Sequence, residues 1–504
     1  MSAFDGLMLG FQVALTWEAL AFCAFGVTVG MLIGVLPGIG PLAAVSMVLP
    51  LTYYTTPTHG LIMLAGIYYG SQYGGSVSSI LLRLPGETSA AVTALDGYEM
   101  TKKGRAGQAL LITTLASFFG GSIGIVLMAV FSPMLAEVAL SFASVEMCAL
   151  MVAGLVAASA LTDDAPVKGF AMVAIGLLIG IAGMDVTTGT MRFTYDQIQL
   201  LDGVNLVAAA LGLFGVAEIL ANIGQPDNTQ LAARKVTMRS MIPTRKELTD
   251  SIPSTFRGTA IGVLFGILPG AGATISSYFS YAMEKRFSRN RDRLGTGVVE
   301  GVAAPEAANN AAAQTAFIPM LVLGIPGNPL MALMLGAMII HGVAPGARML
   351  TNTPDVFWGL VASFWVGNLL LLVLNIPLIG IWVRLLSVRY RLLYPAILLL
   401  IVIGVYSVNN SIFDVYQLIF FSMMGYAMRL LGFSPAPLVL GLVLGPMLEQ
   451  NLRRSLMLSD GDFSVFFTRP ISAFLLAVSA LIVILALRRA WTIRRPPPAE
   501  PATL

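Results

Sequence analysis

A ladder of glycines spaced four residues apart occurs twice in this chain and constrains its fold more than any other feature. The copies read GVTVGMLIGVLPGIG, from Gly26 to Gly40, and GTAIGVLFGILPGAG, from Gly258 to Gly272. Small residues at every fourth position let another helix backbone approach closely, and the Pro-Gly near the end of each copy interrupts the helix. Packing alone accounts for the outer glycines, so the break that ends each copy is the candidate binding site.

The composition indicates that both copies lie in a membrane protein. Of the 504 residues, 57% are hydrophobic and only 11% are charged, and the mean hydropathy is +0.82. Soluble domains carry about 25% charged residues, and several stretches here reach the ~20 apolar residues that a spanning helix needs. We expect an all-α polytopic membrane protein with two inverted-topology repeats, broken helices or re-entrant hairpins, and about 12–15 membrane segments.

Basic residues indicate which loops face the cytoplasm. They cluster at 102–105, at 234–246 and, after the second ladder, at 285–293, whereas the segment TYYTTPTH after the first ladder has no Lys or Arg. The charge bias thus changes sides between the two copies, as an inverted repeat requires. The loop that carries Arg453 and Arg454 fits this topology least well. The expected parts are a membrane repeat (18–222), a cytoplasmic linker (223–255), a second membrane repeat (256–448), a periplasmic loop (449–468), a final transmembrane helix (470–487) and a cytoplasmic tail (488–504).

The Pro-Gly breaks are candidate sites because irregular backbone persists at membrane depth only where protein buries it or a wet cavity faces it. Freed N–H groups at the start of the next half-helix favour a carboxylate, and freed carbonyls can bind a cation such as sodium. A purely structural role is the alternative. A second pair of breaks, LPGE around Gly86 and IPGN around Gly327, closes two segments that are rich in small and polar residues.

Polar side chains in these segments line a polar cavity or, alternatively, form hydrogen bonds between helices. The ionisable residues near the breaks are Arg83, Glu87, Glu300 and Glu306. A charge inside the membrane is costly, so each of them is a functional hypothesis. Arg83 either pairs with a substrate carboxylate or extends its charged end to the membrane interface.

Several catalytic signatures are missing from the sequence. It contains no G-x-x-x-x-G-K-[ST], no H-E-x-x-H and no G-x-S-x-G, so P-loop nucleotide hydrolysis and the commonest protease and esterase chemistries are not expected. We expect no enzyme activity and no cofactor, and transport energy would come from an ion gradient. An ion or anion channel built on the same broken helices is the alternative function.

Three long motifs resemble one known family. GVLPGIGPLAAVSMVLPLTY, YYGSQYGGSVSSILLRLPGE and GILPGAGATISSYFSYAMEKRFS are similar to the large membrane subunit of the tripartite tricarboxylate transporters, the TctA family. The resemblance runs from about residue 18 to about residue 450. It implies a multi-pass symporter of the bacterial inner membrane, usually coupled to Na+. It also implies two partners, a small four-helix membrane subunit (TctB-like) and a periplasmic solute-binding protein (TctC-like).

The family takes up citrate and related di- and tricarboxylates, with some aromatic carboxylates, and the sequence does not choose among them. We expect the anion between the two halves, near the membrane midplane, and sodium on backbone carbonyls near Gly38, Gly86, Gly270 and Gly327. The residues expected to bind the substrate are Pro37, Gly38, Gly40, Ser46, Ser76, Ser78, Arg83, Thr88, Ser89, Gly270, Gly272, Thr274, Ser276, Asn309, Asn310, Gln314 and Asn328.

Overall fold

The computed structural model describes residues 2–36, 40–160, 166–185, 188–222, 236, 238–268, 272–386 and 390–493. Within these ranges the regular secondary structure is helical except for one antiparallel pair of short strands, β1 (Gly183–Met184) and β2 (Met191–Arg192). The expected all-α fold is therefore confirmed. The first part of the expected linker (223–235) and the end of the expected tail (494–504) lie outside the described residues.

Four helices in the described ranges are long and apolar enough to cross a membrane, by length and composition. Shorter apolar helices accompany them, and two of these, Gly40–Thr52 and Pro329–Ile340, begin directly after expected breaks. The inverted arrangement of the repeats and the number of membrane segments stay predictions. The four candidate spans are Trp17–Val35, Ala106–Leu140, Pro354–Asn375 and Pro470–Arg488.

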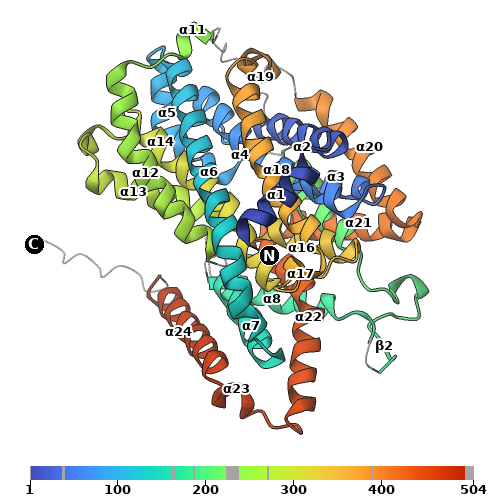
Figure 1. Ribbon diagram of the computed structural model, residues 1–504. Helices are drawn as coiled ribbons and strands as arrows, with labels where there is room; N and C mark the ends of the chain where they lie inside the picture. Colours follow the sequence, from blue (N-terminus) through green and yellow to red (C-terminus); the bar gives the residue numbers. More distant parts are fainter. Residues whose placement is uncertain are drawn as a thin grey trace, which may run out of the picture. The chain divides into compact units, whose positions relative to one another are not determined.

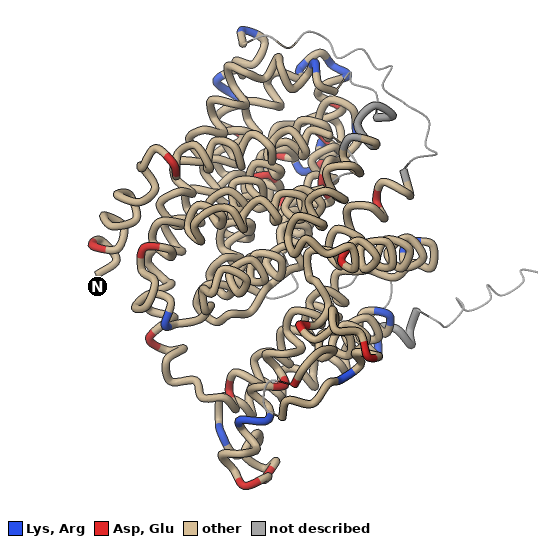
Figure 2. Tube along the Cα trace, turned by 90° about the vertical axis from the view of Figure 1, so that its right-hand side faces the viewer, with Lys and Arg blue, Asp and Glu red and all other residues tan. Residues whose placement is uncertain are grey.

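The helices pack as two compact units, each built from two stretches of chain. Unit 1 comprises Met1–Ser141 and Val204–Ala427, and unit 2 comprises Phe142–Gly203 and Met428–Leu504. In the tube view most of the helix length is uncharged, and Lys and Arg lie mainly in loops and at helix ends (Figure 2).

Unit 1 begins with helices whose first turns are capped by side chains. Thr16 caps α2 and Thr56 caps α4, where Pro57 occupies the first turn and has no N–H that needs a partner. The elements of its first stretch are α1 (Ala3–Ala14), α2 (Trp17–Val35), α3 (Gly40–Thr52), α4 (Pro57–Leu82), η1 (Thr88–Ala90), α5 (Thr93–Lys102) and α6 (Ala106–Leu140).

The second stretch of unit 1 contains helices on either side of the second ladder. A capping box between Thr244 and Glu247 starts α12, and Asn328 caps α16. The elements are α9 (Leu206–Ala210), the π-helical η3 (Leu211–Val216), α10 (Ala217–Asn222), α11 (Met238–Met241), α12 (Arg245–Ile267), α13 (Gly272–Phe287), η4 (Arg291–Arg293), α14 (Glu300–Thr315), α15 (Phe317–Leu323), α16 (Pro329–Ile340), α17 (Met349–Asn352), α18 (Pro354–Asn375), α19 (Ile379–Leu385), α20 (Tyr390–Asn409) and α21 (Ile412–Leu430).

Both glycine ladders lie in close helix contacts. A Cβ placed on Gly30 of α2 would be 2.3 Å from the carbonyl oxygen of Ile67 in α4. A Cβ on Gly262 of α12 would likewise be 2.3 Å from the carbonyl oxygen of Ala308 in α14. Only glycine permits such an approach between backbones. The prediction that the outer glycines pack helices is confirmed, and each ladder packs on the helix segment that leads to the second break of its own half (Figure 1).

The two second breaks also begin alike. Arg83 ends α4 with a left-handed backbone (φ 59°), and Gly324 ends α15 in the same conformation (φ 71°). A left-handed residue at the end of a helix turns the chain away from the helix axis. The two sequence-related halves therefore share their local construction as well as their motifs.

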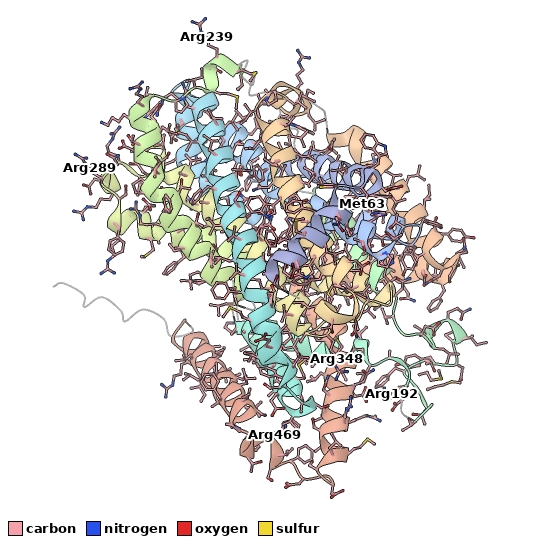
Figure 3. All side chains as sticks on the ribbon, in the orientation of Figure 1. Met63, Arg192, Arg239, Arg289, Arg348 and Arg469 are labelled. Carbon is pink, nitrogen blue, oxygen red and sulfur yellow. The ribbon has the colours of Figure 1, made fainter. Side chains whose placement is uncertain are left out.

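Loops of unit 1 that carry basic clusters meet one another. Arg105 pairs with Glu247 and donates to the carbonyl oxygen of Gly297 at 3.3 Å. In a different group of loops, the rings of Tyr53 and His341 lie 6.4 Å apart. Figure 3 shows Arg239 and Arg289 toward the upper left of unit 1 and Arg348 at its lower edge.

Unit 2 is held by close helix packing. A Cβ on Gly176 of α8 would lie 2.1 Å from the carbonyl oxygen of Leu438 in α22, and one on Gly180 would lie 2.5 Å from that of Leu442. The elements of unit 2 are α7 (Ser144–Ala160), α8 (Pro166–Gly180), β1, β2, η2 (Ile198–Leu200), α22 (Ala436–Leu458), α23 (Val465–Thr468) and α24 (Pro470–Ile493).

Ion pairs join the loops of unit 2. Arg192 of β2 pairs with Glu449 of α22 at 2.7 Å, and Arg453 pairs with Asp185 at 3.0 Å. Arg453 was one of the two basic residues that fitted the expected periplasmic loop least well. Its charge is offset by the acidic side chains of Asp185 and Glu449, and the topology of this loop stays a prediction.

Candidate functional site

The structure describes the two breaks that end the glycine ladders only in part. Pro37, Gly38 and Gly270 lie outside the described residues, and the sites expected at them stay predictions. The helices that follow begin at Gly40 (φ 68°) and Gly272 (φ 58°). Both angles are in the left-handed region that favours glycine, so each ladder is followed by a new helix N-terminus.

The loops of both second breaks reach the first turn of α13. The hydroxyl oxygens of Thr88 and Thr274 are 2.9 Å apart, and a Cβ on Gly272 would lie 4.0 Å from that of Asn328. Asn328 in turn accepts a 2.9 Å hydrogen bond from the N–H of Met331 and caps α16. The N-termini of α13 and α16 are therefore neighbours, and helix N-termini attract anions.

The loop that follows α4 carries a carboxylate, that of Glu87. A Cβ on Gly86 would lie only 1.8 Å from the carbonyl oxygen of Gly34, so the loop lies directly on the last described rung of the ladder. Glu87 accepts a 2.8 Å hydrogen bond from the Gln72 amide, which accepts a 3.0 Å hydrogen bond from Ser89. The second carboxylate oxygen of Glu87 is buried and has no hydrogen-bond partner within the described chain.

A second carboxylate lies deeper in unit 1. Glu306 of α14 accepts hydrogen bonds from Ser76 of α4 at 2.5 Å and from Thr93 of α5 at 2.6 Å, and all three side chains are fully buried. Such distances are typical of hydroxyl groups that donate to an ionised carboxylate. These bonds connect the first sequence half to the second (Figure 1), where α4, α5, α6 and α14 pack together.

No basic residue compensates the two carboxylates. Among the described residues, neither Glu87 nor Glu306 pairs with a Lys or Arg. A buried carboxylate without a cationic partner is costly, and inside a membrane protein it marks a functional position.

Several expected site residues have other partners. Ser46 and Ser78 donate to carbonyls of their own helices, those of Leu42 at 2.8 Å and Gly75 at 3.1 Å. Arg83 is exposed at the end of α4. Their roles in substrate binding stay predictions.

Residues of α13 and α14 among the expected set are mostly buried. Ser276 donates to the carbonyl oxygen of Ala308 at 3.1 Å, which joins α13 to α14, and Asn310 donates to that of Glu306 at 3.1 Å. Asn309 is fully buried and neither of its amide atoms has a hydrogen-bond partner within the described residues. The Oε1 atom of Gln314 is likewise buried without one.

Gln72 and Thr93, which donate hydrogen bonds to Glu87 and Glu306, were not among the residues expected to bind substrate. Gln72 lies in the run YYGSQYGG, and the density of small and polar residues in that segment was the available signal. Thr93 lies in a segment with no comparable signal, and only the packing of α5 against α14 brings it to Glu306.

Apolar helices that are broken in pairs, with helix N-termini where the second-break loops meet and buried carboxylates nearby, are typical of a membrane transporter. Comparison with known proteins identifies the transporter family. The chain belongs to the tripartite tricarboxylate transporter TctA family, whose family model matches residues 20–440. The family consists of transporters rather than enzymes.

Two relatives from Agrobacterium vitis carry no assigned activity. One, an uncharacterised 52.8 kDa protein in the TAR-I ttuC' 3' region, is 48% identical over 487 residues, covering 97% of each chain. The other, an uncharacterised protein in the TAR-II ttuC' 3' region, is 54% identical over 226 residues, covering 45% of this chain and 93% of the relative. A search of the solved structures found no significant match.

Proposed function

We propose that this protein is the large membrane subunit of a carboxylate importer, which moves a di- or tricarboxylate across the bacterial inner membrane by symport with sodium. The observation that carries this proposal is the meeting of both second-break loops at the start of α13. There Thr88 contacts Thr274, and Asn328 lies beside Gly272. Family membership supports the transporter class, and the neighbouring helix N-termini support an anion site at this point.

The substrate carboxylate would lie at the N-termini of α13 and α16. Free backbone N–H groups in the first turn of α13, together with the Thr88 and Thr274 hydroxyls, would donate to it. In α16, by contrast, Pro329 has no N–H and that of Met331 is bonded to Asn328. Each helix N-terminus contributes about half a positive charge. A site with two N-termini attracts one anionic group without an arginine, which fits the exposed position of Arg83.

The expected inverted topology draws support from the loop contacts. Arg105 of the first basic cluster contacts Glu247 and Gly297, which adjoin the other two basic clusters. Tyr53 and His341 form a separate contact between loops with few basic residues. The loops that touch are therefore those assigned to the same side of the membrane by charge.

Two partner proteins complete the proposed system. A small TctB-like membrane subunit would stabilise the carrier, and a periplasmic TctC-like protein would capture the substrate and release it at the outer face. Movement of the segments that carry the motifs would then expose the site to the cytoplasm.

The test is uptake into proteoliposomes that contain all three proteins, with citrate as the first probe and related carboxylates after it. Replacing Thr88 or Thr274 with Val removes a hydroxyl donor and keeps the side-chain shape. A hydrogen bond to a charged group contributes about 1.5–3 kcal/mol, so we expect the KM for the carboxylate to rise roughly tenfold or more.

Thr255→Val is the matched control, because that hydroxyl donates only to the carbonyl oxygen of Ser251 in its own helix at 2.9 Å. An unchanged KM in both test variants would contradict the assigned site. Flux that neither saturates nor depends on sodium would contradict the symporter and favour a channel.

A further inference from the structure

Oxygen-bearing side chains from four helices face the carboxylate of Glu306. Ser76 of α4 and Thr93 of α5 donate to it at 2.5 and 2.6 Å. Asn309 of α14 and Ser117 of α6 also interact with this carboxylate, although neither completes a hydrogen bond of normal geometry. We call these five residues the Glu306 cluster.

The cluster is buried and incompletely satisfied. All five side chains are 0% exposed. Both amide atoms of Asn309 and the hydroxyl of Ser117 lack a hydrogen-bond partner within the described chain. Leaving a buried polar group unpaired costs about 1–3 kcal/mol, and two of these atoms, the amide oxygen of Asn309 and the hydroxyl oxygen of Ser117, have lone pairs for a ligand that the protein itself does not supply.

Charge defines the kind of ligand. Glu306 has no Lys or Arg partner among the described residues, and a second carboxylate, that of Glu87, lies close enough to interact with it electrostatically. Glu87 lies in the same loop as Thr88, which reaches the proposed anion site at Thr274. Two uncompensated negative charges would repel an incoming carboxylate, and a bound cation would remove part of that repulsion.

We propose that the Glu306 cluster binds the coupling sodium ion. The donors are a carboxylate, three hydroxyl groups and an amide oxygen, and oxygen ligands of this kind suit hard cations. A single carboxylate balances one positive charge. The coupling role rests on the proposed symport, and it places the ion on side-chain oxygens instead of the backbone carbonyls near the breaks.

The position of the cluster explains how ion and substrate are linked. Ser76 and Thr93 belong to the first sequence half, whereas Glu306 and Asn309 belong to the second. A sodium ion held by all four joins the halves, and it acts on the helix α4 that ends beside Glu87 and Thr88. Binding of the ion therefore favours the arrangement in which the anion site is assembled, which is positive coupling between the two ligands.

The test is equilibrium binding of radiolabelled sodium to the purified full-length protein, with choline replacing sodium to keep ionic strength constant. Wild-type protein is expected to bind sodium saturably, and Glu306→Gln to lose this binding. Ser76→Ala and Thr93→Val should weaken it about tenfold each. Ser277→Ala is the matched control, because Ser277 is a buried serine that donates only to the carbonyl oxygens of Ala273 and Pro305.

The Ser76 and Thr93 variants keep the proposal testable if Glu306→Gln does not fold. Unchanged sodium affinity in both of them, or saturable binding that survives in folded Glu306→Gln, would overturn the proposal. So would loss of binding in Glu87→Gln alone, or a wild-type protein that binds no sodium while the three-protein system still takes up carboxylate. Sodium binding that depends on Glu306 in a system without carboxylate uptake would support the site and contradict the proposed function.

Discussion

The buried carboxylate of Asp96 accepts a 2.7 Å hydrogen bond from the backbone N–H of Gly297. The same carboxylate accepts from the N–H groups of Gly295 and Val298 at 2.9 Å each and from the hydroxyl of Tyr281 at 2.8 Å. Both glycines have positive φ angles, 90° and 91°, which turn their N–H groups toward one point. The contact fixes α5 of the first half to the loop that leads into α14 of the second.

Replacing Asp96 with Asn should therefore destabilise the protein. An amide presents one acceptor oxygen and an NH2 group that faces the backbone donors, so at least one buried N–H loses its partner. We expect the free energy of unfolding to fall by about 1.5–3 kcal/mol, measured by thermal denaturation of the purified protein. Asp292→Asn is the control, because its side chain is 92% exposed. Equal stability of the two variants would contradict this account.

The glycine ladders predict a second stability difference. Gly30→Ala and Gly262→Ala would each put a Cβ 2.3 Å from a carbonyl oxygen of the facing helix, so the helices must separate. We expect each change to lower the melting temperature. Gly380→Ala in α19 is the matched control, since a Cβ there has no neighbour within 4 Å. A helical Ala is favoured over Gly by about 0.5–1 kcal/mol, so this variant should match or exceed the wild type in stability. A ladder variant as stable as Gly380→Ala would contradict the close contact.

Much of the helix content could be predicted because apolar runs and breaks are local signals. The final transmembrane helix expected at 470–487 lies within α24. The start of α12 could not be read from hydropathy, because its first turns are polar and are fixed by the Thr244–Glu247 capping box. The helix α5 could not be predicted from hydropathy either, because its sequence is polar.

The site was harder to predict because its contacts join distant parts of the chain. Glu306 was recognised as a charge near a break, but nothing in its sequence neighbourhood indicates Ser76 or Thr93 as its partners. Those contacts follow from how α4 and α5 pack against α14. Serines such as Ser46 show the opposite case, in which a polar residue of a promising segment bonds to its own helix.

The inverted topology predicts which engineered cysteines react from outside the cell. In a background without Cys23 and Cys148, Arg289→Cys should be labelled by an impermeant maleimide only in inside-out vesicles, and Arg348→Cys only in intact cells. Both arginines are exposed, and they occupy different edges of unit 1 in Figure 3. Arg239→Cys is the same-side control and should behave like Arg289→Cys. Labelling of Arg289→Cys and Arg348→Cys from one side would refute the inversion.

The ion pairs of unit 2 predict a loss of stability in acid. Hydrogen bonds from Arg192, at 2.7 and 3.1 Å, hold the pKa of Glu449 below its ordinary value. A carboxyl group whose pKa is lower in the folded protein contributes stability above its unfolded pKa of about 4.3, and this contribution disappears as the pH falls through the lower, folded value. Acidification from pH 6 toward pH 3 should therefore lower the melting temperature of the wild type more than that of Glu449→Gln. Asp460→Asn, an exposed change in the neighbouring loop, should keep the wild-type pH dependence. Identical acid sensitivity of wild type and Glu449→Gln would show that the pair with Arg192 adds nothing to stability.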